Sequence, residues 1–233
     1  MARAGSLLSR APREPRSAGS LLERSTAFEH GLRVALRANL TSFEHREIET
    51  VRLRPAAVCI AVLQRPGSDS AAFLLTRRPR RLSRHSGQYA LPGGRLDKGE
   101  SAERAALREL EEELGIGQSS VNVVGRLDDY ATRSGFRITP VVAWIDERVQ
   151  IRADASEVEA FFYVPLDDLL RPGIPRLRAI DESDRPVLSI EFASLGDEVF
   201  APTAAILYQF REVALCGRAT RVAHYDQPVF AWR

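Results

Sequence analysis

The sequence predicts an α/β protein, because segments with the pattern of buried strands alternate with segments that have the character of helices. Residues 56–63, Ala-Ala-Val-Cys-Ile-Ala-Val-Leu, form an apolar run of strand length. Residues 102–114 instead combine good helix formers with no interrupting proline, between Ser101 as a candidate N-cap and Gly115 as a C-terminal stop. The 233 residues, 44% hydrophobic and 27% charged, are sufficient for a soluble globular core.

One helix is expected before the first strand, in residues 26–40, where apolar side chains recur with a period near 3.6. Residues 25–54 would then be this helix and a connector. The preceding residues 1–24 are rich in Arg, Ser, Ala, Gly and Pro, and we interpret them as a flexible basic arm. An organelle transit peptide is the alternative, although Pro12 and Pro15 would interrupt its amphipathic helix.

Short apolar segments separated by turn residues indicate further strands downstream. Pro140 lies within one of them and predicts an edge position or a bulge, because proline cannot donate a ladder hydrogen bond. The stretch 171–178 is expected to be a linker, and Thr203 is a candidate N-cap for a last helix over 204–215. The expected strands cover residues 71–76, 121–127, 136–145, 187–192 and 198–200, with a short helix at 167–170.

The composition argues against several classes of function. A formal net charge of only +2 is not that of a protein built mainly to bind nucleic acid or an anionic membrane. No apolar run approaches the roughly 18 residues that span a bilayer, so no membrane partner is expected. The two cysteines, Cys59 and Cys216, form neither a disulfide framework nor a zinc-site pattern, which favours a reducing, cytoplasmic setting.

Three glutamates share one face of the predicted central helix. Glu109, Glu112 and Glu113 are spaced at i, i+3 and i+4. Carboxylates this close repel each other, and a hard divalent cation such as Mg²⁺, which binds a few carboxylates together with substrate phosphates, removes that cost. Arg108 is placed to pair with a neighbouring glutamate and fix its orientation. The alternative is a solvated acidic helix face, which we prefer for Glu111.

The spacing around this face resembles that of the Nudix hydrolases. A glycine, five residues, a glutamate, seven residues and then Arg-Glu-Leu-x-Glu-Glu-x-Gly-Ile match the Nudix box from Gly94 to Ile116. The resemblance implies an α/β/α sandwich with a mixed sheet and the box as a loop-helix-loop. It places the domain at residues 55–216, with a tail at 217–233. Gly93 and Gly94 allow the backbone to turn tightly at the start of the box.

The resemblance also implies a reaction, the metal-dependent hydrolysis of a diphosphate linkage. Mg²⁺ or Mn²⁺ would be held by Glu109, Glu112 and Glu113. Either Glu109 or Glu112 would take the proton of the attacking water. Arg108 would steer a glutamate, and Glu100 would anchor the loop.

A basic segment precedes the box. It contains Arg77, Arg78, Arg80, Arg81 and Arg84, with no acidic residue among them. Each guanidinium offers a planar fork of donors that suits phosphate. A flexible basic loop is the alternative interpretation.

This basic segment resembles the motif that lies upstream of the Nudix box in coenzyme A diphosphatases. That resemblance implies coenzyme A or an acyl-coenzyme A as substrate, with 3′,5′-ADP and 4′-phosphopantetheine as products. Pro79, Ser83 and Leu91 depart from the motif. Arg84 or Arg81 would then supply the charge for the coenzyme's 3′-phosphate. The matching residues are Leu74, Leu75, Thr76, Arg78, Gly87, Pro92, Gly93 and Gly94.

Residues beyond the box complete the expected site. Tyr130 and Phe136 lie in a run that also resembles the coenzyme A branch, and each would stack on a base or else pack within the protein. Glu157 and Glu159 lie on a loop whose glutamate assists catalysis or holds metal in several Nudix branches. The alternative for both is a solvated surface acid.

Two other functions stay open at this point. One keeps the enzyme class and changes the small-molecule substrate to ADP-ribose, NADH or a nucleoside triphosphate. The other is a non-catalytic Nudix domain that binds and senses a nucleotide, although a pure binder has no need of three adjacent acids. Many Nudix proteins are dimers, so a homodimer is expected by resemblance alone.

Overall fold

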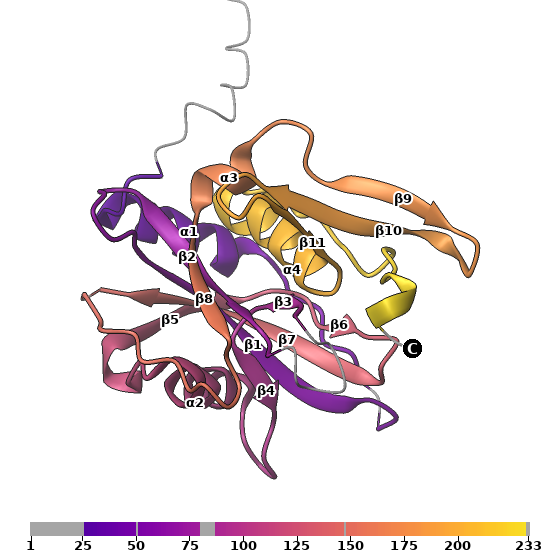
Figure 1. Ribbon diagram of the computed structural model, residues 1–233, viewed down its shortest axis with the longest axis horizontal. Helices are drawn as coiled ribbons and strands as arrows, with labels where there is room; N and C mark the ends of the chain where they lie inside the picture. The colour runs from indigo at the N-terminus through magenta and orange to yellow at the C-terminus, as the bar shows by residue number, and fades with distance from the viewer. Residues whose placement is uncertain (1–25, 50, 80–86, 147, 232–233) are drawn as a thin grey trace, which may run out of the picture.

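The structure confirms the α/β class and shows where the elements lie (Figure 1). The predicted basic arm 1–24, together with Arg80, Arg81 and Arg84 of the basic segment, lies outside the described part of the chain. The computed structural model describes residues 26–49, 51–79, 87–146 and 148–231.

A mixed sheet of eight strands forms the centre of the molecule (Figure 1). The main path has the order β3-β2-β1-β7-β5, while β4 pairs with β1, β6 with β7 and β8 with β2. β1 and β7 run parallel, in a register that opposes Val58 and Pro140. The other pairs are antiparallel. The strands are β1 (Arg54–Gln64), β2 (Ala71–Arg77), β3 (Tyr89–Ala90), β4 (Gly93–Arg95), β5 (Val121–Arg126), β6 (Tyr130–Ala131), β7 (Phe136–Ile145) and β8 (Ala160–Pro165).

Helices cover both faces of this sheet, which explains the continuous apolar run of β1. Ile60 and Val62 join the cluster that contains α1 and α4 residues, whereas Cys59 and Ala61 join the cluster that contains α2 residues. The predicted α/β/α sandwich is therefore confirmed. No helix in the described ranges is long and apolar enough to cross a membrane. The helices are α1 (His30–Ser42), α2 (Ala102–Leu114), α3 (Leu166–Leu170) and α4 (Thr203–Phe210), the π-helix η3 (Arg211–Leu215), and the 3₁₀-helices η2 (Gln118–Ser120) and η4 (Val229–Ala231).

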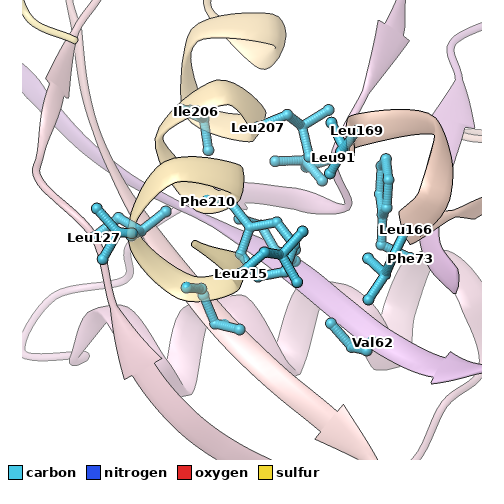
Figure 2. Packing of buried hydrophobic residues seen from close by; sticks show 14 of the residues in the cluster. Val62, Phe73, Leu91, Leu127, Leu166, Leu169, Ile206, Leu207, Phe210 and Leu215 are labelled. Atoms are coloured by element: carbon cyan, nitrogen blue, oxygen red, sulfur yellow. The ribbon is translucent and has the colours of Figure 1, made fainter. Parts of the chain in front are cut away.

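The cluster on the α4 side is the larger part of the core. Figure 2 shows Leu207 and Phe210 of α4 beside Phe73 of β2 and Leu166 of α3, and all four side chains are buried. α4 therefore anchors the C-terminal part of the chain to the sheet.

A second, three-stranded antiparallel sheet follows α3 in the chain and packs against α4 (Figure 1). The predicted linker 171–178 is wrong over its second half, because Arg176 and Arg178 belong to an edge strand in which Arg178 opposes Val187. Most of that edge strand is exposed, so its sequence lacks the apolar pattern of a buried strand. The strands are β9 (Arg176–Ile180), β10 (Ser183–Phe192) and β11 (Asp197–Phe200).

The ends of the helices were predicted with mixed success. The Ser101 hydroxyl accepts a hydrogen bond from the Arg104 amide at 3.3 Å, and Gly115 ends α2 with φ 67°, both as predicted. Thr203 as N-cap is wrong: Thr203 is the first residue of α4, and Pro202 precedes it without a capping side chain. α1 begins at His30, four residues later than predicted.

Pro140 does not lie on an edge strand, because β7 has neighbours on both sides. On the β1 side it opposes Val58. On the other side it lies between the segment of β7 that pairs with β6 and the segment that pairs with β5. The proline therefore lies at an interruption of the antiparallel ladder. The ladder needs no N–H donor at this position, so proline is tolerated there.

Candidate active site

Three carboxylates come together beside the N-terminal end of β4. Glu109 and Glu113 are one turn apart on α2, and Glu157 comes from the loop before β8. One oxygen from each lies within 4.8 Å of the others. The sequence predicted Glu109, Glu112 and Glu113 as one group, and it gave Glu157 only as a loop candidate.

The glycines that begin the box make room for this cluster. A Cβ on Gly94 would lie 2.2 Å from Glu109 Oε1, so any residue other than glycine would clash with that carboxylate in its present position. A Cβ on Gly93 would lie 2.3 Å from the Ala57 carbonyl oxygen of β1. The Gly93 amide also donates to Glu113 Oε1 at 3.4 Å. The two glycines are therefore required by close approach.

Arg108 links the loop and the helix of the box. Its Nε donates to Glu100 Oε1 at 3.0 Å, and its Nη1 donates to Glu109 Oε1 at 2.8 Å. Nη2 also donates to the Arg95 carbonyl at 3.0 Å. These bonds lower the pKa of the Glu100 carboxyl and fix the position of the Glu109 carboxylate.

Glu112 is placed differently from the other two glutamates of the predicted metal set. It accepts a bond from Arg108 Nη1 at 2.9 Å, and its side chain is 57% exposed. Successive helix positions are about 100° apart, and here Glu112 and Glu113 leave the helix in different directions. Glu113 is 5% exposed and points inward. Among the described residues, Glu157 completes the group of carboxylates instead of Glu112.

The protonation of the cluster reflects its burial. Burial raises the pKa of the Glu113 carboxyl, the Gly93 N–H opposes this rise and the nearby Glu109 charge adds to it, so that the pKa lies at about 8. Burial also raises the pKa of Glu109, against the effect of Arg108. Buried carboxylates that resist ionisation are stabilised in the charged form by a cation. An all-oxygen donor set of this kind fits Mg²⁺ or Mn²⁺.

This burial predicts how the metal-free protein responds to pH. Between the ordinary Glu value of 4.5 and about 8, folded Glu113 holds a proton that the unfolded chain has lost. The folded state binds more protons, so its stability falls as pH rises. We expect the free energy of unfolding of the wild type, relative to Glu113→Gln, to fall by roughly a few kcal/mol from about pH 5 to pH 8 in EDTA. Denaturant titrations at both pH values measure it, and a difference that stays constant would contradict the buried acid.

A cavity of about 370 Å³ opens beside the cluster, and we call it the catalytic cavity. Glu113 and Glu157 line it together with Arg78, whose Nε is buried without a hydrogen-bond partner among the described atoms. A guanidinium in this state is suited to an anionic ligand. The wall of the catalytic cavity also includes Val58, Tyr89, Leu91, Phe136, Ile138, Pro202, Thr203, Ile206, Gln227 and Ala231.

Of the other residues predicted to bind substrate, some line the catalytic cavity and some do not. Arg77 lies near Glu159, with Nε 3.6 Å from Oε2, and it does not line the catalytic cavity. Tyr130 is 2% exposed and donates its hydroxyl to the Tyr225 carbonyl at 3.0 Å, which favours the packing interpretation. Phe136 lines the cavity, and the Arg54 guanidinium carbon lies 4.0 Å from its ring centre.

The C-terminal contribution to the cavity was missed. Gln227 and Ala231 belong to the segment that was predicted as a tail, yet both line the catalytic cavity. An ion pair holds this segment in place, in which Arg133 Nε donates to Asp226 Oδ1 at 3.0 Å. The Asp226 amide donates to the Pro186 carbonyl at 2.9 Å. No local pattern indicates these contacts, which join positions far apart in the chain.

Comparison with known proteins places this site in a family. The model of the NUDIX domain matches residues 52–187. The "Uncharacterized Nudix hydrolase NudL" of Citrobacter koseri is 43% identical over 128 residues, which cover 54% of this chain and 64% of the relative. The protein of the same name from Escherichia coli is 43% identical over 126 residues, with the same coverage. The chain therefore spans less than two thirds of the length of these relatives. The solved structure of a MutT/nudix family protein from Enterococcus faecalis is 20% identical and has a TM-score of 0.45. The match covers 71% of this chain and 64% of the Enterococcus faecalis chain.

Proposed function

The chain belongs to the NUDIX family, and we propose that it hydrolyses a diphosphate linkage within a small nucleotide substrate. The observation that carries this proposal is the group formed by Glu109, Glu113 and Glu157, whose carboxylate oxygens lie within 4.8 Å of one another at the catalytic cavity. A nucleotide sensor without catalysis has no use for the carboxyls of Glu109 and Glu113, because their partial or full burial costs desolvation energy.

Nudix hydrolases generally need a divalent metal, and Glu109, Glu113 and Glu157 are the residues that would hold it. Bound Mg²⁺ or Mn²⁺ would neutralise charge on the diphosphate and acidify a water. Arg108 holds the Glu109 carboxylate in position. Glu109 and Glu112 were the candidates for general base, and we favour Glu109 because it alone of the two lies in the cluster.

Arg78 is the residue that we propose for substrate phosphate. Its side chain lines the catalytic cavity, and its buried Nε has no partner among the described atoms. A phosphate oxygen would supply the missing acceptor. Arg81 and Arg84 remain candidates for a further phosphate, as the resemblance implies.

We propose coenzyme A or an acyl-coenzyme A as the substrate. Support comes from the motif of Leu74, Leu75, Thr76 and Arg78, and from the place of Arg78 in the cavity. Water would add across the P–O–P bond and leave one phosphate on 3′,5′-ADP and the other on 4′-phosphopantetheine. A cytoplasmic setting and a homodimer belong to this proposal as well. The departures at Pro79 and Ser83 favour ADP-ribose or NADH as second candidates.

A chromatographic product assay tests the substrate. We expect 3′,5′-ADP to form from coenzyme A in the presence of Mg²⁺ or Mn²⁺, faster than products form from ADP-ribose, NADH or a nucleoside triphosphate. Dephospho-coenzyme A lacks the 3′-phosphate, and its kcat/KM should be lower by a factor of about ten or more. This is the loss expected for one charged contact. Equal kcat/KM for the two coenzymes would remove the role of the basic segment. Faster turnover of ADP-ribose would replace the substrate and keep the metal site.

A further inference from the structure

A second cavity adjoins the catalytic cavity, and we call it the aromatic cavity. Its volume is about 190 Å³. The two cavities share four wall residues, so they lie next to each other. The shared residues are Gln88, Tyr89, Pro202 and Thr203. The rest of the aromatic cavity is lined by residues 197–201, Gly87 and Phe230.

Aromatic rings from three separate segments line this cavity. Tyr89 comes from β3, Phe200 from β11 and Phe230 from η4. The Phe200 and Phe230 rings meet edge to face, with centroids 5.4 Å apart and planes at 90°. Phe230 nevertheless is 53% exposed. A half-exposed phenyl ring in the wall of a cavity is suited to stacking on a planar ligand.

The polar lining is acidic and therefore unsuited to phosphate. Glu198 is engaged by Arg178 Nη2 at 2.8 Å and by the Ser189 hydroxyl at 2.7 Å. Asp197 accepts from the Glu198 amide at 2.8 Å, and its charge helps to raise the pKa of the Tyr89 hydroxyl, after burial. Asp197 is exposed, so its carboxylate retains acceptor capacity for a ligand N–H. Phosphate instead suits Arg78, which lines only the catalytic cavity of the two.

We propose that the aromatic cavity binds the nucleobase of the substrate, a planar base with an exocyclic amino group such as adenine. The ring would stack on Phe230, and the amino group would donate to Asp197. This inference rests on the proposed function, because it gives each half of a nucleotide diphosphate a place. Phe200 and Phe230 lie beyond residues 52–187, so this base site is built in part by residues outside the NUDIX match.

Binding of AMP without metal tests the base site. We expect Phe230→Leu, which keeps an apolar side chain but loses the ring, to raise the Kd of AMP about tenfold, as loss of one base stack implies. Phe230→Tyr keeps the π-face and should bind AMP as the wild type does. Titration by NMR up to millimolar AMP in EDTA gives the three constants. Binding of ribose 5-phosphate, which has no base, should be unchanged in both variants.

The outcomes separate this inference from the proposed function, since AMP has no diphosphate bond to cleave. Equal Kd values for the wild type and Phe230→Leu would overturn the base site, as would a wild type that does not bind AMP. Either result leaves the product assay to decide on hydrolysis. If AMP affinity depends on the Phe230 ring but no diphosphate is cleaved, the base site stands and the proposed hydrolysis fails.

Discussion

Glu113→Gln is expected to reduce turnover of the diphosphate substrate by about 100-fold or more while the protein stays folded. The substitution keeps the shape of the side chain and removes its negative charge. Glu113 is 5% exposed, and it lies close to Glu109 and Glu157 and lines the catalytic cavity. Its charge therefore acts where solvent screens it little. Steady-state kcat/KM with Mg²⁺ measures the loss, and circular dichroism reports the fold.

Glu111→Gln is the matched control on the same helix. Glu111 is exposed and accepts a hydrogen bond from Gln118 Nε2 at 3.0 Å. It does not belong to the cluster of three glutamates that would hold the metal. Its turnover should equal that of the wild type. If Glu113→Gln also retained wild-type turnover, the role assigned to Glu113 in the metal site would be rejected.

The part of this site that lies on one helix was predictable, because helical spacing alone places Glu109 and Glu113 on one face. Their separation from Glu112 depends on which face of α2 meets the sheet, and spacing alone does not give that. Glu157 enters from a loop more than forty positions after Glu113 in sequence. A local pattern carries no signal for such a contact, which forms only when the loop before β8 reaches α2.

The same limit applies to the fold. The buried strand β1 was predictable because both of its faces are apolar. β9 was not, because its residues are mostly exposed and arginine-rich. Of the two positions predicted for Pro140, an edge or a bulge, the edge is wrong, since the rule considers one ladder at a time. Here the antiparallel neighbour of β7 changes from β6 to β5 at that residue, which removes the conflict.

Gly94→Ala is expected to abolish most activity without unfolding the protein. The new Cβ would meet Glu109 Oε1 at 2.2 Å and Cδ at 2.4 Å, so the carboxylate must leave its present place. It is the end of a flexible side chain, and the backbone around Gly94 need not move. A displacement of about 1 Å in a catalytic group can cost roughly 100-fold in rate. We expect a loss of that size in kcat/KM, with a melting temperature close to that of the wild type.

Gly93→Ala provides the contrast, because the atoms it would meet belong to the backbone. Its Cβ would lie 2.3 Å from the Ala57 carbonyl oxygen and 2.7 Å from the Val58 Cα, where β4 pairs with β1. Neither atom can turn away, so we expect a loss of about 1–3 kcal/mol in stability, as for other overpacked sites. Thermal unfolding and kcat/KM of both variants compare the two effects. Wild-type turnover in Gly94→Ala would mean that the position of the Glu109 carboxylate does not matter to the reaction, and Glu109 would then lose its assigned role.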